Sequence, residues 1–357
     1  MMEQQDKPNL HKLAKSSGKA DSEAFRRILE CAMSEEEAGF VRALPASYED
    51  VAAKFSMNRK EVEDKILGLA RRGLLSRSPD DCSPEKFRFP NIPAILHDNI
   101  LSSNPQHVPK EMPKLWMDLY RGEGWCREIG EMYQLFEEPL LRVIPAKKSI
   151  PRELTLMPCE NIAEIIQANR NLITVRNCCC RVGADTCHHP RDVCMQFKGR
   201  AEFDLYRGSG RKVSADEAVS VALTSVGAGL VPTVTNISLT DKLEFICFCC
   251  GCACMVLHPG LEAGSLARIL SPSRYEAQVD HEACDGCEHC VIRCQFGAIE
   301  MKPVLGHETL KAVIDPAKCY GCGVCELACM PSAIRMAEER PKEFIPVGVK
   351  GEEILHF

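Results

Sequence analysis

The sequence predicts an α+β fold with several domains, and three observations support this prediction. Residues 22–78 carry repeated helix-start signals, residues 151–262 combine helical and strand patterns, and residues 275–337 contain an internal repeat. A chain of 357 residues is long enough for two to four domains. We divide it into a flexible tail (1–20), a helical module (21–82), a connector (83–150), a cysteine-rich α/β middle domain (151–265), a repeat domain (270–340) and a C-terminal tail (341–357).

Cysteine is the residue type that departs most from an ordinary composition. The chain has 22 cysteines, of which 18 lie in residues 178–329. Its N-terminus has no apolar run typical of a secretory signal, and no stretch of about 18 apolar residues could span a bilayer. We therefore expect a cytoplasmic protein whose thiols serve metal or redox chemistry rather than disulfides, in an anaerobic or strongly reducing cell. The net charge of −6 provides no basic field for nucleic acid.

The helical module begins its helices with capping residues. "SEEE" at Ser34–Glu37 is a capping box, Ser47 can cap a second helix, and "NRKE" at Asn58–Glu61 precedes a third. Gly73 can end this third helix in a left-handed conformation. The apolar face of the third helix is expected to contain Val62, Ile66, Leu67 and Leu69.

The short helix, tight turn, longer helix and following "GLLSRS" resemble a winged helix-turn-helix. That family implies either DNA binding or a docking module of the same shape. The candidate recognition helix, 59–72, mixes basic residues with Glu61, Glu63 and Asp64, whereas a DNA-reading face is usually more uniformly basic. We therefore interpret the module as a protein-docking domain, with DNA binding as the alternative.

The connector and the middle domain contain few signals other than their cysteines. The connector is rich in proline, with helical patches at 114–120 and 128–138, and its Trp116 and Trp125 are expected in the core. In the middle domain we predict helices at 161–168 and 214–229 and strands at "LITV" and "LEFIC". The glycines of "VGAGLVP" follow a helix rather than a strand, so neither flavin nor NAD is expected.

The internal repeat has a constant offset of 35 residues. Each copy contains C-x₂-C-x₂-C-x₃-C, a spacing that lets three thiolates from one loop reach a 4Fe–4S cluster while the fourth comes from elsewhere. The repeat resembles the bacterial two-cluster ferredoxins, a fold of two β-hairpins and two short helices. The resemblance implies two 4Fe–4S clusters, one held by Cys284, Cys287, Cys290 and Cys329 and the other by Cys319, Cys322, Cys325 and Cys294.

The repeat departs from that family at one position. Proline usually follows the fourth cysteine directly, but Gln295 and Met330 stand there in this chain. The ligands are retained, so the departure concerns the hydrogen bonds to the sulfurs and the reduction potentials. A pair of zinc sites is the alternative for this segment, although three evenly spaced cysteines fit zinc less well.

Two further groups of cysteines lie in the middle domain. They are Cys178, Cys179, Cys180, Cys187 and Cys194 in the first group, and Cys247, Cys249, Cys250, Cys252 and Cys254 in the second. Residues 150–337 resemble ferredoxin-containing oxidoreductase subunits of anaerobic bacteria, which have C-x-C-R…C-x-x-P…C followed by a dense CxCCxC cluster. We expect one or two further 4Fe–4S clusters, with all of these cysteines except Cys179 as candidate ligands. Zinc binding and a redox-active disulfide are the alternatives.

The direction of these side chains can be predicted from an extended chain, where successive residues point to opposite sides. On that basis Cys178 and Cys180 should point away from Cys179, and Cys250, Cys252 and Cys254 should share a face. Arg181 is either a stabiliser of a reduced cluster or a surface charge. His188 and His189 are possible ligands, but we expect a loop histidine beside Pro190 to make hydrogen bonds only. The isolated cysteines are expected to be structural or incidental; they are Cys31, Cys82, Cys126 and Cys159.

These features favour a multi-cluster electron-transfer protein, a subunit of a cytoplasmic anaerobic oxidoreductase complex that relays single electrons between partner proteins. The sequence identifies no small-molecule substrate and no catalytic residue. One alternative is an oxidoreductase with a substrate-binding cluster in the middle domain. The other is an iron–sulfur redox sensor that uses the N-terminal module on DNA.

Overall fold

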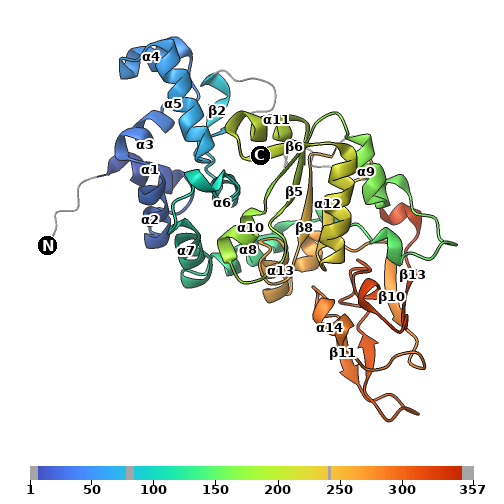
Figure 1. Cartoon of the computed structure of the whole chain (residues 1–357). Coiled ribbons are helices and arrows are strands. Elements are labelled where there is room, and N and C mark those ends of the chain that lie inside the picture. Colours follow the sequence, from blue (N-terminus) through green and yellow to red (C-terminus); the bar gives the residue numbers. More distant parts are fainter. Residues whose placement is uncertain (1–6, 78–83, 240–242, 348–357) are drawn as a thin grey trace. The chain divides into compact units, whose positions relative to one another are not determined.

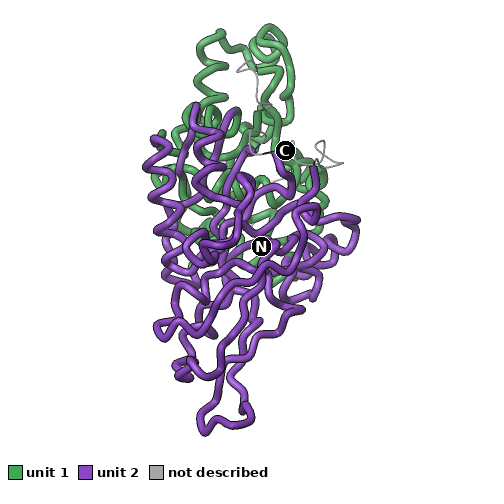
Figure 2. The backbone as a smooth tube through the Cα atoms, turned by 90° about the vertical axis from the view of Figure 1, so that its right-hand side faces the viewer, with its two compact units in different colours: residues 1–125, 176–185, 199–212 green, residues 126–175, 186–198, 213–357 purple. Residues whose placement is uncertain are grey.

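The computed structural model describes residues 7–77, 84–239 and 243–347 and divides the chain into two compact units. Unit 1 comprises residues 1–125, 176–185 and 199–212, and unit 2 comprises residues 126–175, 186–198 and 213–357 (Figure 2). The linear segments predicted from the sequence are therefore interleaved, because the middle segment contributes to both units. The predicted incidental Cys82 lies outside the described residues.

Unit 1 is mainly helical. Its N-terminal helices are α1 (Pro8–Ser16), α2 (Glu23–Ala32), α3 (Glu35–Val41), α4 (Tyr48–Phe55) and α5 (Arg59–Arg71), followed by the antiparallel strands β1 (Ser76–Arg77) and β2 (Phe87–Arg88). Its other helices are α6 (Pro93–Leu101), α7 (Met112–Met117), α10 (Cys179–Ala184) and most of α11 (Lys198–Arg207) (Figure 1).

The helix caps of unit 1 match the sequence signals. Ser34 and Asn58 form capping boxes, Ser47 accepts a hydrogen bond from the backbone N–H of Asp50, and Gly73 has a φ of 78°. The tail prediction differs from the structure, since Pro8–Ser16 are helical. Leu10, Leu13 and Ala14 of α1 are buried, and this apolar stripe holds the helix in place despite its polar flanks.

An aromatic cluster fills part of unit 1. His97 lies edge-on to Trp116, with 5.0 Å between ring centroids, and also packs against Trp125. Both tryptophans are buried, as predicted. Burial lowers the pKa of His97 to about 4, because the imidazolium would lose its hydration, although neighbouring Asp98 opposes this shift. The folded unit therefore holds a neutral imidazole at neutral pH.

Unit 2 is built on a sheet in which β4, β5, β8, β7, β3 and β9 are neighbours in that order (Figure 1). The strands are β3 (Leu141–Val143), β4 (Ile173–Asn177), β5 (Asp192–Phe197), β6 (Gly210–Val213), β7 (Val231–Thr235), β8 (Phe245–Cys249) and β9 (Leu270–Ser271), of which the end of β4 and most of β6 belong to unit 1. β8 pairs antiparallel with both β5 and β7, so Thr233 lies opposite Cys247 and Val231 opposite Cys249.

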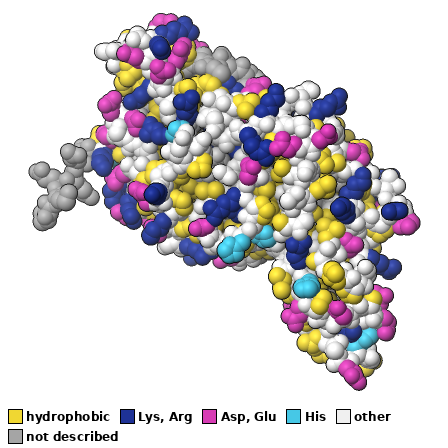
Figure 3. Space-filling model, viewed as in Figure 1, with side chains coloured by type: hydrophobic (Ala, Val, Ile, Leu, Met, Phe, Trp, Pro, Cys, Tyr) yellow, Lys and Arg dark blue, Asp and Glu magenta, His cyan; other side chains and the backbone are white. Residues whose placement is uncertain are grey.

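Helices connect and cover these strands. They are α8 (Trp125–Met132), α9 (Ile162–Ala168), α12 (Ala215–Gly227) and α13 (Leu257–Glu262), and α12 packs against β5, β7 and β8. Asn161 caps α9 and Ser214 caps α12, and both helices begin where the sequence predicts. No helix in the described part of the chain has the length and apolar character that crossing a membrane requires. On the face in Figure 3, Lys and Arg are interspersed with Asp and Glu.

The repeat forms the C-terminal part of unit 2. Its strands are β10 (Tyr275–Val279), β11 (Ile299–Lys302), β12 (Lys311–Ile314) and β13 (Ile334–Glu338), with the short helix α14 (His289–Arg293) in the first copy and a 3₁₀ turn, Glu326–Ala328, in the second. β11 and β12 form a hairpin, but β10 pairs with β13 from the far end of the domain. The expectation of two hairpins is therefore wrong, because each sheet joins one strand from each repeat.

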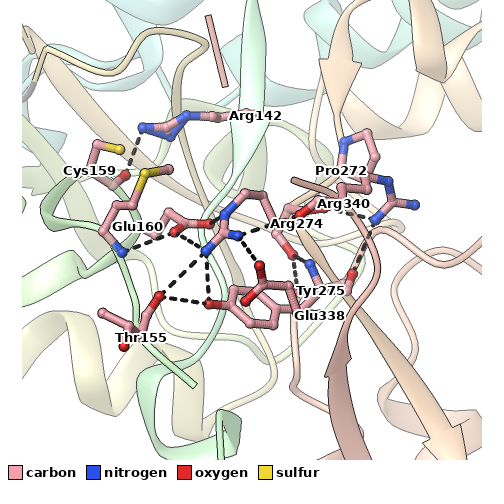
Figure 4. Close-up of polar contacts among 12 residues, drawn as sticks. Arg142, Thr155, Cys159, Glu160, Pro272, Arg274, Tyr275, Glu338 and Arg340 are labelled. Atoms are coloured by element: carbon pink, nitrogen blue, oxygen red, sulfur yellow. Dashed lines mark hydrogen bonds and ion pairs between the residues drawn. The ribbon is translucent and has the colours of Figure 1, made fainter. Parts of the chain in front are cut away.

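A buried cation joins the repeat to the segment before α9. Arg274 is fully buried, and its Nε and Nη2 donate to the two carboxylate oxygens of Glu160 at 2.8 and 2.9 Å (Figure 4). Its Nη1 donates to Glu338 at 2.7 Å. Burial alone would lower the pKa of Arg274, but the hydrogen bonds and charge of Glu160 raise it. The pair thereby ties strand β13, the start of β10 and residues 155–160 together.

The pKa of His97 predicts acid sensitivity. The unfolded histidine binds a proton below about pH 6.5, whereas the folded one does so only near pH 4, so stability is present above pH 6.5 and is lost as the pH falls. We expect a loss of about 2 kcal/mol from this residue by pH 5. His97→Gln should remove that part of the pH dependence, and the exposed control His11→Gln should keep it. Tryptophan fluorescence during urea unfolding reports the transition, because both tryptophans lie beside His97.

The buried ion pair predicts a large effect of removing one partner. Arg274→Ala leaves Glu160 buried without its cation and should lower the free energy of unfolding by about 3–5 kcal/mol. Adding Glu160→Gln should recover part of this loss, since the stranded charge is removed. The control Arg335→Ala, at an exposed position of β13, should change stability by less than about 0.5 kcal/mol. Equal effects of Arg274→Ala and Arg335→Ala in anaerobic urea denaturation would contradict the importance of this pair.

Candidate metal centres

Two cavities in the repeat are each lined by four cysteines. One cavity, with about 330 Å³ of space between atoms, is lined by Cys294, Cys319, Cys322 and Cys325. The other, with about 310 Å³, is lined by Cys284, Cys287, Cys290 and Cys329. These are the two sets that the ferredoxin resemblance implied. Each set takes three thiols from one repeat and the last thiol of the other, in keeping with the exchanged strand pairs.

The two cavities offer matching hydrogen bonds to sulfur. The backbone N–H of Ala298 donates to Cys294 Sγ at 3.3 Å, and the N–H of Ala333, which is 35 residues later, donates to Cys329 Sγ at 3.2 Å. The pKa values of Cys287, Cys290, Cys322 and Cys325 are raised overall, and backbone N–H groups oppose this rise. The rise comes from burial at the last three and from Asp285 at Cys287. Such donors stabilise thiolate sulfur and tune the potential of a cluster bound to it.

Burial makes these thiols dependent on a cation. It raises the pKa of Cys290 to about 11 and that of Cys322 to about 12, because a thiolate in an apolar surrounding loses its hydration. Four thiolates could share one cavity only with a metal to neutralise them, and a coordinating thiol is deprotonated outright. Four converging sulfurs with N–H donors form the donor set that a 4Fe–4S cluster requires.

Unit 2 contains a third set of four thiols on β5, on β8 and in the turn after β8. We call them the sheet thiols (Cys194, Cys247, Cys249 and Cys254). Their sulfurs form a contact series in that order. A hydrogen bond with Cys194 lowers the pKa of Cys247, but Cys249 and burial raise it well above its ordinary value. Gln196 donates to Cys194 Sγ at 3.2 Å, and Val256 N–H donates to Cys254 Sγ at 3.4 Å. Four buried or half-buried sulfurs with these donors also fit a cysteine-held metal centre.

A fourth set in unit 2 contains three thiols, which we call the loop thiols (Cys187, Cys250 and Cys252). Their sulfurs all lie within 4.8 Å of one another. Cys250 is buried, Cys187 is half-buried and Cys252 is exposed. Burial raises the pKa of Cys252, and its contact with Cys187 adds to the shift. The shared face of Cys250, Cys252 and Cys254 was expected for an extended loop, but this loop turns, because Cys254 N–H donates to the carbonyl oxygen of Cys250 at 3.1 Å.

The remaining thiols of the first group lie in unit 1. Cys178 precedes α10 and Cys179 begins it, so the backbone is helical where we expected an extended chain. The sulfurs of Cys179 and Cys180 are 3.8 Å apart, and the expected divergence of these two side chains is wrong. Contact with Cys180 and burial raise the pKa of Cys179 well above its ordinary value. Arg181 is buried, which rules out the surface-charge interpretation.

One group of potential ligands was not predicted from the sequence. Cys126, predicted to be incidental, lies with His258 and Glu262, and their ligand atoms are within 4.8 Å of one another. The signal was weak, because His258 and Glu262 are only a four-residue pair on a helix and Cys126 is 132 residues from His258. His188 and His189 do not belong to either of the ligand groups found among the described residues.

Comparison with known families identifies the repeat. The family described as "4Fe-4S dicluster domain" matches residues 283–342. No curated protein and no solved structure matches the chain. The matched segment contains all eight cysteines of the two cavities. The chain therefore carries an iron–sulfur domain of the two-cluster type, with additional cysteine groups outside it.

The exchange of cysteines between repeats predicts which variants share a defect. Cys294→Ala and Cys319→Ala lie in different repeats but line one cavity, so both should remove the same cluster and lower the iron content by about four per chain. Cys290→Ala should remove the other cluster. EPR of the reduced, anaerobically purified protein distinguishes the two signals, and Cys31→Ala serves as the control. If Cys294→Ala shared its defect with Cys290→Ala instead, the ligand assignment would be wrong.

Proposed function

We propose that this protein is a multi-centre electron relay, a subunit of a cytoplasmic anaerobic oxidoreductase complex that passes single electrons between partner proteins. The two cavities of the repeat would hold 4Fe–4S clusters, and the sheet thiols and loop thiols would hold one or two more. Such clusters supply one-electron redox chemistry at potentials set by burial, charge and hydrogen bonds to sulfur. The proposal rests chiefly on a direct junction between the repeat and the loop thiols.

The junction is made by the residue after Cys294. Gly251 N–H donates to Gln295 Oε1 at 2.9 Å, and Gln295 Nε2 donates to the carbonyl oxygen of Gly229 at 3.0 Å. The neighbouring Arg293 donates to the carbonyl oxygen of Gly227 at 2.5 Å. A single side-chain amide thus connects the backbone beside Cys294 to two loops of the middle domain.

The contact is close enough to require glycine on one side. A Cβ atom at position 251 would lie 2.5 Å from the carbonyl oxygen of Gln295, which is closer than such atoms approach. Gly251 stands between Cys250 and Cys252, both loop thiols. A route of covalent bonds and one hydrogen bond therefore runs from Cys294 through Gln295 and Gly251 to the loop thiols.

This junction also accounts for the departure from the ferredoxin pattern. Proline after Cys294 would lack the side-chain amide that makes both hydrogen bonds of Gln295. The equivalent residue of the second repeat, Met330, is 83% exposed and has no side-chain amide that could make such hydrogen bonds. The two repeats thus differ at the position where one of them contacts the other thiol groups.

The cysteine set of the other cavity has one exposed member, Cys287, and suits exchange with a partner protein. The adjacent apolar residues Met330 and Ile292 are 83% and 78% exposed. Exposed apolar side chains next to a redox centre are typical of a transient docking surface. Electrons exchanged here would reach the loop thiols through the cavity lined by Cys294 and then through Gln295.

In unit 1, helices α3–α5 with β1 and β2 would form the winged-helix-like docking module. Two basic side chains of α5 lie beside acidic ones, since Arg59 Nε lies 3.1 Å from Glu63 and Lys65 Nζ lies 3.8 Å from Glu36. Phosphate contacts would have to compete with these pairs, which favours a protein partner over DNA.

A second candidate function is an oxidoreductase with a substrate-binding cluster. The loop thiols favour it, because three close sulfurs, one of them exposed, leave a coordination position for another ligand. A change in the EPR spectrum of the reduced protein on adding a substrate would support this function. Electron exchange with a partner protein, without any such change on adding substrate, would support the relay.

The relay predicts that Gln295 controls electron passage to the loop thiols. Gln295→Met, which copies the residue of the second repeat, should slow intramolecular electron transfer about ten-fold or more, since it removes the hydrogen bond to Gly251. Flash reduction of the anaerobic protein, followed by optical and EPR detection, measures this rate. Iron content should be unchanged, and Met330→Gln should have no effect on the rate. An unaltered rate in Gln295→Met would contradict this route.

A further inference from the structure

Three side chains of different types converge in unit 2, away from the cavities of the repeat. Cys126 Sγ lies 2.9 Å from Glu262 Oε2 and 3.5 Å from His258 Nδ1, and the latter two atoms are 3.9 Å apart. Thiolate sulfur, imidazole nitrogen and carboxylate oxygen are the three ligand types that zinc accepts in proteins. We propose that Cys126, His258 and Glu262 form a mononuclear binding site for a divalent metal ion of the zinc type.

The helices that carry these residues are built to approach closely. His258 and Glu262 are four residues apart on α13 and so share one face. Cys126 and Gly130 share a face of α8 in the same way. A Cβ atom at Gly130 would lie 2.6 Å from Ala263 Cβ and 2.7 Å from the carbonyl oxygen of Pro259. Glycine at this point therefore lets α8 approach α13 and brings Cys126 to the two ligands.

Two further contacts fix this arrangement. Ser265 donates to the carbonyl oxygen of Gly130 at 2.7 Å, just after α13. Tyr133 donates to the carbonyl oxygens of Met255 and Val256, just before α13, at 3.2 and 3.3 Å. Contacts on both sides of the helix pair give the ligands the rigid support that a metal site requires.

The charges at the site match a divalent ion. In the present arrangement the thiol of Cys126 donates to Glu262. When M²⁺ binds, a metal–sulfur bond replaces the S–H bond, one proton leaves for solvent, and no electron is transferred. The thiolate and the carboxylate then balance the two charges of the ion, so that no net charge is buried.

The exposure of the ligands provides an entry path. Cys126 is 5% exposed, whereas the side chains of His258 and Glu262 are 20% and 61% exposed. The ion would enter along α13 and reach the thiol last. Because the group provides three ligand atoms, a four-coordinate ion would keep one position for water or another small ligand, as in catalytic rather than structural zinc sites.

Zinc titration of the full-length, anaerobically purified protein tests this proposal. The protein is first washed with EDTA, and its iron content is measured before and after the titration. We expect one zinc ion to bind per chain. X-ray absorption at the zinc edge should then show one sulfur ligand, with nitrogen and oxygen as the other ligands. His258→Gln and Glu262→Gln should each weaken zinc binding about ten-fold or more without changing the iron content. The control Glu131→Gln, an exposed residue of α8, should bind zinc normally.

The proposal can fail independently of the electron relay. A zinc shell made only of sulfur would place the ion among the cysteine groups and overturn it. So would normal zinc affinity in both His258→Gln and Glu262→Gln, or the absence of zinc binding by protein with full iron content. His258 and Glu262 carry the test because they are partly exposed, whereas replacing the buried Cys126 also disturbs packing.

Discussion

Close burial of thiols is the constraint on which the rest of unit 2 depends. Four sulfurs in an apolar cavity cannot ionise together unless a cation neutralises them, and burial already raises the pKa of Cys322 to about 12. The strands of the repeat bring four such thiols together twice by pairing β10 with β13 and β11 with β12. Metal binding and folding of this domain are consequently linked, because the metal supplies the free energy that holds the thiolates together.

The remaining contacts of unit 2 fix where these thiol groups lie. Arg274 and Glu160 form a buried pair at the entry to the repeat, and Gln295 joins the residue beside Cys294 to Gly251. The first contact fixes the repeat against the segment before α9. The second brings one of its cysteine sets next to the loop thiols. Arg274 directly precedes β10, and Gln295 lies two residues after α14. Changes in the cysteine loops of the repeat would therefore alter both contacts.

The sequence predicted the features that depend on local chemistry. Spacing and the offset of 35 residues predicted the two cysteine motifs, and the ferredoxin resemblance implied the two sets that line the cavities. The capping residues Ser34, Ser47 and Asn58 marked the starts of three helices. Features that depend on tertiary contacts were not predictable. The pairing of β10 with β13 joins segments more than 50 residues apart, and α10 is helical at cysteines that we expected in an extended chain. The site at Cys126 depends on the close approach of α8 and α13, which no local sequence pattern indicates.

The proposed relay requires additional iron held by thiols outside the repeat. Its most direct test is the iron, sulfide and zinc content of the anaerobically purified protein. We predict about twelve or more iron atoms and as many sulfides per chain, because at least one cysteine group of the middle domain would hold a 4Fe–4S cluster. About eight iron and eight sulfide, with zinc or no metal at the sheet thiols and loop thiols, would contradict it and leave a two-cluster ferredoxin domain on a structural scaffold.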